Sequence, residues 1–252
     1  MRQFDVIVWN FPQDDAEKFE PPFTDRDLGW FFDKDLNKCI DESDAEWLVF
    51  AHQSVNIDRN FLNDLAQSIS GFPMVDAFAP KVNLGNGRFA SGYIFHKWNG
   101  LEEIPQDAPL RFVAAPTPYV AAFSRRIVQR TGHLDMDRTP LFAIMDIAFR
   151  MLHAGGKMFS IPYLVASLKT KPDMDNTPKT TTELDPLRKD CAKELGVTLF
   201  KTFGFFGSFG YLMTHLGALH ELYRDRKALN QKRESAILLS KFKPGYRKQI
   251  TA

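Results

Sequence analysis

Short apolar segments with β-strand character alternate along this chain with segments that have the period of an amphipathic α-helix. The strand-like segments cover residues 6–9, 47–50 and 74–80, and the helix-like segments between them cover residues 24–40 and 61–69. Strands separated by helices of this length favour a mostly parallel sheet with right-handed crossovers. The sequence therefore predicts an α/β fold in which helices flank the sheet.

The middle of the chain combines a turn-rich region with further strand and helix signals. Glycines and prolines are frequent in residues 81–109, which predicts loops or a hairpin over one edge of the sheet. Strands are expected at residues 111–115, 119–124 and 158–165. Helices are expected at residues 125–130, with Gly132 as the natural C-cap, and at residues 142–157.

The C-terminal part differs in composition from the rest. Residues 169–195 are polar and rich in proline and threonine, which predicts a long loop or linker. Residues 202–220 carry no Asp, Glu, Lys or Arg and are long enough to span a bilayer, but their glycines and histidines favour helix packing or interfacial attachment. We expect a core in residues 1–168, a linker in 169–195 and a helical, basic extension in 196–252.

Composition excludes disorder and a disulfide-stabilised scaffold. The 252 residues are 44% hydrophobic and 25% charged, as in ordinary globular proteins. Cys39 and Cys191 are too few for a disulfide framework and lack metal-ligand spacing, which favours a reducing compartment. The N-terminus leads into residues 6–9 without the apolar region of a secretory signal, so we expect a cytoplasmic protein.

Positive charge gathers at the C-terminal end. Residues 221–252 hold nine Lys or Arg against three Asp or Glu, a balance of +6, whereas residues 1–220 have a balance of −5. Such a tail can attract anionic lipid headgroups or nucleic-acid phosphates, and it can equally be a solvated helix face. No recognisable nucleic-acid-binding module accompanies it, so a nucleic-acid partner is not expected.

A polar turn follows the strand-like residues 47–50 and precedes the helix that begins near residue 59. This turn contains His52, Gln53 and Ser54. Ligands of open α/β sheets gather at the carboxyl ends of strands, so these residues are the first candidates for binding. A neutral imidazole can bind a metal or a phosphate, and the alternative is a strand-end histidine whose hydrogen bonds are made by backbone.

The order and spacing of these parts resemble the GT-A glycosyltransferases, in particular the inverting family-2 type. The resemblance covers roughly residues 40–168. The matching residues are Glu46-Trp47-Leu48-Val49-Phe50 before the turn, Phe61-Leu62 and Leu65 after it, Gly132 to Asp135, and the block from Asp146 through Arg150 to Gly155. The resemblance implies a GT-A-like, Rossmann-like mixed sheet and a nucleotide-sugar donor bound by His52, Gln53 and Ser54.

Two positions depart from the family's pattern. Ser54 stands where the family has the carboxylate that binds Mn or Mg, and these ions prefer anionic oxygen, so no metal ligand is assigned. The family's Glu-Asp pair, which includes the general base, falls at Ala143 and Ile144. Asp146 is the nearest acid and is the catalytic base that the resemblance implies.

Each of these candidates has a structural alternative. Asp146 can pair with Arg150 one helical turn later instead of acting on an acceptor. Arg88, together with Lys81 and Lys97, can bind the donor phosphates without a metal, or these residues can simply be surface charge.

Two hypotheses of function remain. The first is a glycosyltransferase that moves a sugar from a nucleotide-sugar donor to a glycan or lipid-linked acceptor, as in bacterial-type surface polysaccharide synthesis, in the cytoplasm or at the inner face of the membrane. The second is a non-catalytic GT-A-like protein that binds a sugar, a nucleotide or a partner. The fold does not decide between them, because function depends on the site.

Overall fold

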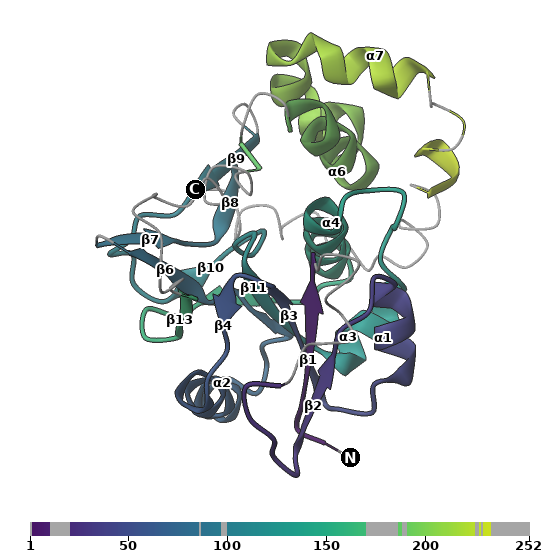
Figure 1. Cartoon of the computed structure of the whole chain (residues 1–252). Helices are drawn as coiled ribbons and strands as arrows, with labels where there is room; N and C mark the ends of the chain where they lie inside the picture. Colours follow the sequence, from purple (N-terminus) through teal and green to yellow (C-terminus); the bar gives the residue numbers. More distant parts are fainter. Residues whose placement is uncertain are drawn as a thin grey trace.

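The centre of the protein is a seven-stranded mixed sheet, seen in a computed structural model that describes residues 2–10, 21–85, 87–96, 100–169, 186–187, 191–224, 227 and 229–232 (Figure 1). The strand order is β10-β12-β5-β11-β3-β1-β2. The strands are β1 Phe4–Trp9, β2 Leu28–Phe31, β3 Trp47–His52, β5 Ala77–Phe78, β10 Arg111–Phe112, β11 Val120–Ser124 and β12 Met158–Ser160.

Five of these strands run in the same direction. Strand β1 is parallel to β2 and β3, and β12 is parallel to β5. Strand β11 is antiparallel to both β3 and β5, and β10 is antiparallel to β12. Every residue of β1 and β3 is buried, which explains why both strands have near-continuous apolar sequences. The predicted mostly parallel mixed sheet with flanking helices is confirmed.

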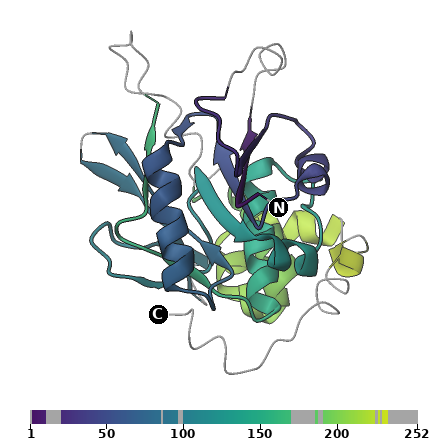
Figure 2. The ribbon, with the colours of Figure 1, turned by 90° about the horizontal axis from the view of Figure 1, so that it is seen from below.

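Four helices accompany the sheet, and their starting points follow capping rules. They are α1 Leu36–Glu42, α2 Arg59–Gly71, α3 Arg125–Thr131 and α4 Pro140–His153. The Asp58 side chain accepts a hydrogen bond from the Phe61 N–H and begins α2. Gly132 follows α3 with a φ of 84°, which confirms the predicted glycine C-cap. Figure 2 shows α2 on the side of the molecule away from α6 and α7.

The helix predicted over residues 24–40 is wrong in its first half. Residues Leu28–Phe31 form β2 and pair with β1, because aromatic residues at this spacing also suit a sheet edge. The helix begins later, at Leu36, where the Asp35 side chain accepts from the N–H groups of Asn37 and Lys38.

Three predicted strands are shorter than expected. Strand β10 occupies two residues of the predicted 111–115. Strand β5 occupies two residues of the predicted 74–80. The single strand predicted over residues 158–165 is divided between β12 and β13 Val165–Leu168, which belong to different sheets. A turn at Pro162 separates them, because proline cannot donate to a sheet ladder, and the Leu164 N–H closes the turn onto the Ile161 carbonyl.

The turn-rich middle of the chain forms two smaller sheets. One has the order β4-β13-β6-β7, with β4 Val55–Asn56, β6 Lys81–Gly85 and β7 Arg88–Ala90. The other is the hairpin of β8 Tyr93–His96 and β9 Gly100–Glu103. The hairpin prediction is confirmed for this region. Strand β4 follows directly on the polar turn, so the four-stranded sheet adjoins the end of β3.

The C-terminal helices α6 Ala192–Thr214 and α7 Leu216–Arg224 lie at one end of the molecule, with α4 between α6 and the large sheet (Figure 1). Phe203 of α6 stacks on Phe95 at 4.4 Å and contacts Phe149 of α4 at 5.4 Å. The charge-free stretch therefore begins within a packed helix. Among the described residues, no helix is long and apolar enough to cross a membrane.

Candidate functional site

The carboxyl ends of β1 and β3 meet at one edge of the large sheet. Trp9 and His52, the last residues of the two strands, are register partners, and their rings contact edge to face at 4.7 Å. The His52 N–H donates to the Tyr119 carbonyl at 2.7 Å, and the Tyr119 ring stands perpendicular to the imidazole. His52 is 3% exposed, so two aromatic side chains and the sheet hold its ring in one orientation.

Both nitrogens of the His52 imidazole have protein partners. Nδ1 accepts from the Ser54 N–H at 3.2 Å and lies 2.7 Å from the Ser54 hydroxyl. Nε2 lies 2.9 Å from Nδ2 of the Asn10 side-chain amide, and the tautomer of the ring sets which of the ring nitrogens donates. Asn10 has a φ of 68°, a left-handed conformation that asparagine tolerates.

His52 is neutral at physiological pH. Burial, together with a smaller contribution from the positive charge of Lys169, lowers its pKa to about 4. The imidazole therefore serves as a rigid hydrogen-bonding group and does not bring positive charge to the turn.

Lys169, which is more than 100 residues after His52 in the sequence, also lies at this edge. Strand β13 pairs antiparallel with β4, with Leu168 opposite Val55, and the Lys169 N–H donates to the Ser54 carbonyl at 2.8 Å. Partial burial of the side chain lowers the pKa of the Lys169 ammonium, while the residue as a whole remains exposed. Solvent and solutes can therefore reach Lys169 beside the turn.

The three predicted turn residues lie together, as the sequence requires, but Arg88 lies elsewhere. The Gln53 N–H donates to the Trp9 carbonyl at 3.1 Å, and Gln53 and Ser54 are half-buried. Arg88 is exposed on β7, which two strands separate from β4. At about 4.8 Å per strand this is roughly 14 Å, so the structure does not bring Arg88 to the turn.

Of the two lysines also proposed to bind phosphate, Lys81 is not available at the turn. Lys81 is buried, and its ammonium donates to the carbonyls of Gln106 and Ala108 at 2.5 and 3.4 Å. Lys97 lies outside the described residues.

The donor groups of the turn do not fit a divalent metal. Ser54 offers a neutral hydroxyl already bonded to His52, and both imidazole nitrogens are occupied. Mn²⁺ and Mg²⁺ need several oxygen ligands, preferably carboxylates. Across the part of the chain that is described, no group of three His, Cys, Asp or Glu side chains is arranged to hold a metal.

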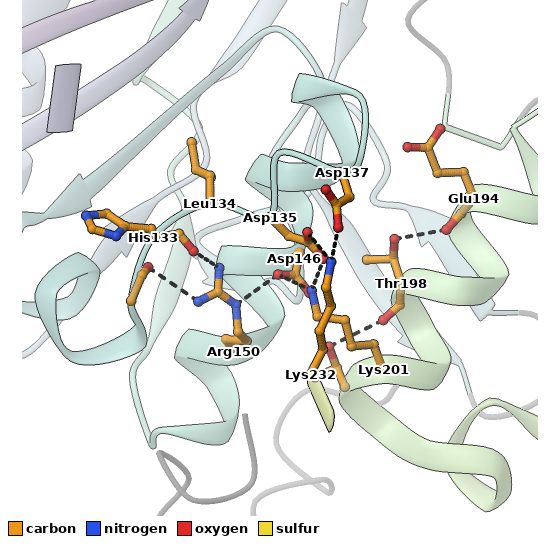
Figure 3. A network of polar contacts seen from close by, with 12 residues as sticks. His133, Leu134, Asp135, Asp137, Asp146, Arg150, Glu194, Thr198, Lys201 and Lys232 are labelled. Carbon is orange, nitrogen blue, oxygen red and sulfur yellow. Dashed lines mark hydrogen bonds and ion pairs between the residues drawn. The ribbon is translucent and has the colours of Figure 1, made fainter. Parts of the chain in front are cut away.

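Asp146 lies in a different place, between α4 and α6 (Figure 3). Its carboxylate is 1% exposed and accepts from Arg150 Nε at 2.9 Å, with Lys201 Nζ also at 2.9 Å. Arg150 donates further to the carbonyls of Thr131 and His133. The ion pair between Asp146 and Arg150 is therefore present, and Arg150 also ties α4 to the backbone that follows α3. A catalytic role for Asp146 stays a prediction.

Asp146 belongs to a larger group of charges that we call the ionic junction, formed by Asp135, Asp137, Asp146, Arg150, Lys201 and Lys232 (Figure 3). Lys201 and Lys232 each approach Asp135 to 2.7 Å. Burial alone would raise the pKa of Asp135, but hydrogen bonds and charge from the two lysines outweigh burial and lower it to about 2. The ionic junction joins α6, through Lys201, to Asp146 of α4 and to Asp135 ahead of that helix.

A separate cavity of about 490 Å³ lies at the opposite end of β3. Trp47, Ser124 and Arg125 are among the residues that line it, and no predicted site residue does. Arg125 and its neighbour Arg126 are already bonded to Ser43 and Asp76. The cavity therefore does not change the choice of the β1–β3 edge as the candidate site.

Sequence reasoning missed three residues of this site, namely Asn10, Tyr119 and Lys169. Asn10 follows the first strand directly, and the rule that places ligands at strand ends applies to it as much as to His52. Tyr119 and Lys169 depend on strand pairings that a single sequence does not reveal, because β11 and β13 approach the turn from distant parts of the chain.

The large mixed sheet, its reversed strand β11 and the polar end of β3 define a GT-A-like fold. A crystal structure of GalNAc-T7 with UDP, GalNAc and Mn²⁺ superposes with a TM-score of 0.59 at 12% sequence identity, covering 99% of this chain and 56% of that one. The chain thus spans just over half the length of that protein.

Two further solved structures are similar at a lower level. The mannosyltransferase PcManGT from Pyrobaculum calidifontis, in complex with GDP-Man and Mn²⁺, gives a TM-score of 0.47 at 14% identity, covering 98% of this chain and 83% of that one. S. aureus TarS with UDP-GlcNAc gives 0.46 at 12% identity, covering 97% and 89%. No protein-family model and no curated protein sequence matches this chain.

Proposed function

We propose that this chain is a glycosyltransferase that binds a nucleotide-sugar donor at the joined carboxyl ends of β1 and β3. The observation that supports this function is the placement of Asn10, His52 and Ser54 together at that edge of a GT-A-like sheet. The contacts among Asn10, His52 and Ser54 fix the turn, and Gln53 and Ser54 keep exposed surface with polar groups held in place. Such groups orient a polar ligand at low entropic cost.

The reaction makes two demands on the protein. The diphosphate that leaves the sugar must have its negative charge stabilised, and the acceptor hydroxyl must lose a proton to a positioned base. The turn addresses the first demand through hydrogen bonds. Asp146 is the proposed base for the second, with a glycan or lipid-linked molecule of surface polysaccharide synthesis as the proposed acceptor.

Calorimetric titration with UDP, GDP and their sugar conjugates tests donor binding. The double variant Gln53→Ala/Ser54→Ala should weaken donor binding about tenfold, the effect of losing one or two hydrogen bonds to a charged ligand. Arg88→Ala is the matched control and should bind as the unmutated protein does, since β7 is remote. A loss of binding in Arg88→Ala and not in the double variant would move the donor site to β7.

A second function, non-catalytic binding of a nucleotide or sugar, is supported by the surroundings of Asp146. Its burial and its contacts with Arg150 and Lys201 leave the carboxylate committed to the ionic junction. With an active protein, Asp146→Asn should lower turnover about 10²-fold or more if Asp146 is the base. Unchanged turnover in a folded variant would remove Asp146 from the mechanism, and an unmutated protein that binds donors without turnover would support the non-catalytic function.

We also propose that the basic C-terminal tail brings the protein to the inner face of a membrane. The motive is the +6 balance of residues 221–252. Leu222 and Leu229 pack against α6, so the tail should be shortened after residue 232 to spare this contact and the ionic junction. Residues 233–252 lie outside the described part. Their removal should weaken binding to anionic vesicles at low salt, and an intact protein that ignores such vesicles would exclude this role.

A further inference from the structure

The turn after β3 lacks the charged groups that a diphosphate needs for neutralisation. Asn10, Gln53 and Ser54 are uncharged side chains, and His52 is held neutral by its surroundings. A diphosphate carries two or more negative charges, and neutral hydrogen bonds stabilise such charge less than cations do. If the turn binds a diphosphate, a positive charge must therefore come from another element.

Lys169 is a cation that the fold delivers to this place. Its backbone N–H is bonded to the carbonyl of Ser54, and its pairing strand β13 is registered against β4, which begins one residue after the turn. The backbone of Lys169 is thus fixed relative to Ser54 by a ladder of hydrogen bonds. Its positive charge also contributes to the lowered pKa of the His52 imidazole.

The side chain is also accessible. Lys169 is exposed, whereas Lys81 is buried and Arg88 lies across the four-stranded sheet. Among Lys81, Arg88 and Lys169, the strand pairing places Lys169 next to the turn that contains His52.

We propose that Lys169 takes the place of a divalent metal at this site and binds the diphosphate of the nucleotide-sugar donor. The proposal rests on the proposed donor-binding function. In the transfer step, the bond between the sugar's anomeric carbon and the β-phosphate oxygen breaks, and its electron pair stays on the departing diphosphate. The acceptor oxygen forms the new bond to the anomeric carbon and gives its proton to the base. The Lys169 ammonium stabilises the negative charge on the diphosphate and exchanges no proton.

Titration of the full-length protein with UDP and GDP, in the presence of a chelator and then of Mn²⁺, tests this assignment. The affinity in chelator should lie within tenfold of the affinity in Mn²⁺. Lys169→Gln should lower the affinity for the diphosphates about tenfold or more, the usual effect of losing a charged hydrogen bond, and Lys169→Arg should retain most of it. Lys193→Gln, an exposed lysine of α6, is the control for a general loss of charge and should not change the affinity.

The effect of the Lys169 charge on His52 can be measured without any ligand. The His52 imidazole can be titrated by NMR, and Lys169→Gln should raise the pKa of His52 while Lys193→Gln leaves it unchanged. This result shows that the Lys169 variant is folded and that the charge faced the turn.

The outcomes separate the two proposals. Diphosphate binding that Lys169→Gln leaves intact, or that Mn²⁺ strengthens more than tenfold, overturns the role of Lys169 and leaves the donor-binding function standing. An unmutated protein that binds no nucleoside diphosphate with or without Mn²⁺ overturns both. Diphosphate binding without metal that depends on Lys169 supports both.

Discussion

The polar turn after β3 and the ionic junction between α4 and α6 differ in the charge of their polar side chains. In the ionic junction, Asp146 is buried and Asp135 is half-buried, and both lie within 3 Å of lysine or arginine nitrogens. At the turn, the partners of His52 are an amide, a hydroxyl and two aromatic rings, with Lys169 as the charge that acts on it.

Asp146, the acid that the sequence suggests as a catalytic base, lies in the ionic junction and not at the turn. Opposite charges that satisfy one another out of water hold elements together but offer little to a ligand. Neutral groups in fixed positions offer hydrogen bonds to an anion, and a nearby lysine adds positive charge. The acid on helix α4 is engaged in ion pairs, whereas Gln53 and Ser54 at the end of β3 keep exposed surface.

The largest expected effect comes from breaking the ionic junction. Lys201→Met removes the cation between Asp135 and Asp146 and leaves the buried Asp146 and the half-buried Asp135 with fewer partners, which should destabilise the protein by about 3–5 kcal/mol. Urea unfolding measures this change, with exposed Lys193→Met as the control at under about 0.5 kcal/mol. Equal stability of the two variants would mean that the ionic junction does not hold the helices.

Acid should weaken the turn before it weakens the ionic junction. His52 has a folded pKa of about 4 against an ordinary value of 6.5, so the unfolded chain binds the proton more readily. Stability from this group is complete above pH 6.5 and is lost as the pH falls toward 4, by up to about 3 kcal/mol. Unfolding measured across this range should show the loss, and His52→Gln should lack it. An imidazole that titrates near 6.5 by NMR contradicts the prediction.

The ionic junction should respond at lower pH. The pKa of Asp135 is about 2 in the folded protein against 3.8 ordinarily, so its contribution is present above pH 3.8 and is lost as the pH falls toward 2. The expected loss is about 2 kcal/mol. Unfolding of the unmutated protein and of Asp135→Asn at pH 5 and pH 2.5 measures it. A difference between the two proteins that stays constant with pH would show that Asp135 is not held ionised by its lysines.

The smallest effect concerns the conformation of Asn10. Asn10→Gly loses the amide that meets His52 but accepts a φ of 68° without strain, whereas Asn10→Ala loses the amide and is strained as well. The alanine variant should be less stable than the glycine variant by about 1 kcal/mol. Thermal unfolding of the pair is the measurement, and an alanine variant as stable as the glycine variant would show that residue 10 does not keep this conformation.

The sequence predicts the parts of this fold that depend on local pattern. Strands β1 and β3, helix α2 with its Asp58 cap and the Gly132 cap of α3 follow from apolar runs and capping residues. The position of the polar turn is predicted as well, because the apolar run of residues 47–50 ends there. The strand-end rule then makes the turn a candidate for ligand binding. Strand β2 was mistaken for helix, since residues 28–32 satisfy both periods.

The parts that the sequence did not predict depend on pairing between distant segments. The approach of Lys169 to Ser54 requires β13 to lie beside β4, and the burial of Asp146 requires α6 to cover α4. Neither contact has a local signature. The same Asp146 that stands out along the chain is removed from solvent by Lys201, a residue in another helix.

The reversed strand β11 has a consequence for the order in which the protein is made. Strand β3 is paired on one side by β1, which precedes it, and on the other by β11, which the ribosome delivers about seventy residues later. Until residues 120–124 emerge, the second edge of β3 has no partner, and its sequence Trp-Leu-Val-Phe-Ala is apolar throughout. An unpaired apolar edge is where nascent chains aggregate. Slow translation between residues 52 and 120 should therefore lower the yield of soluble protein.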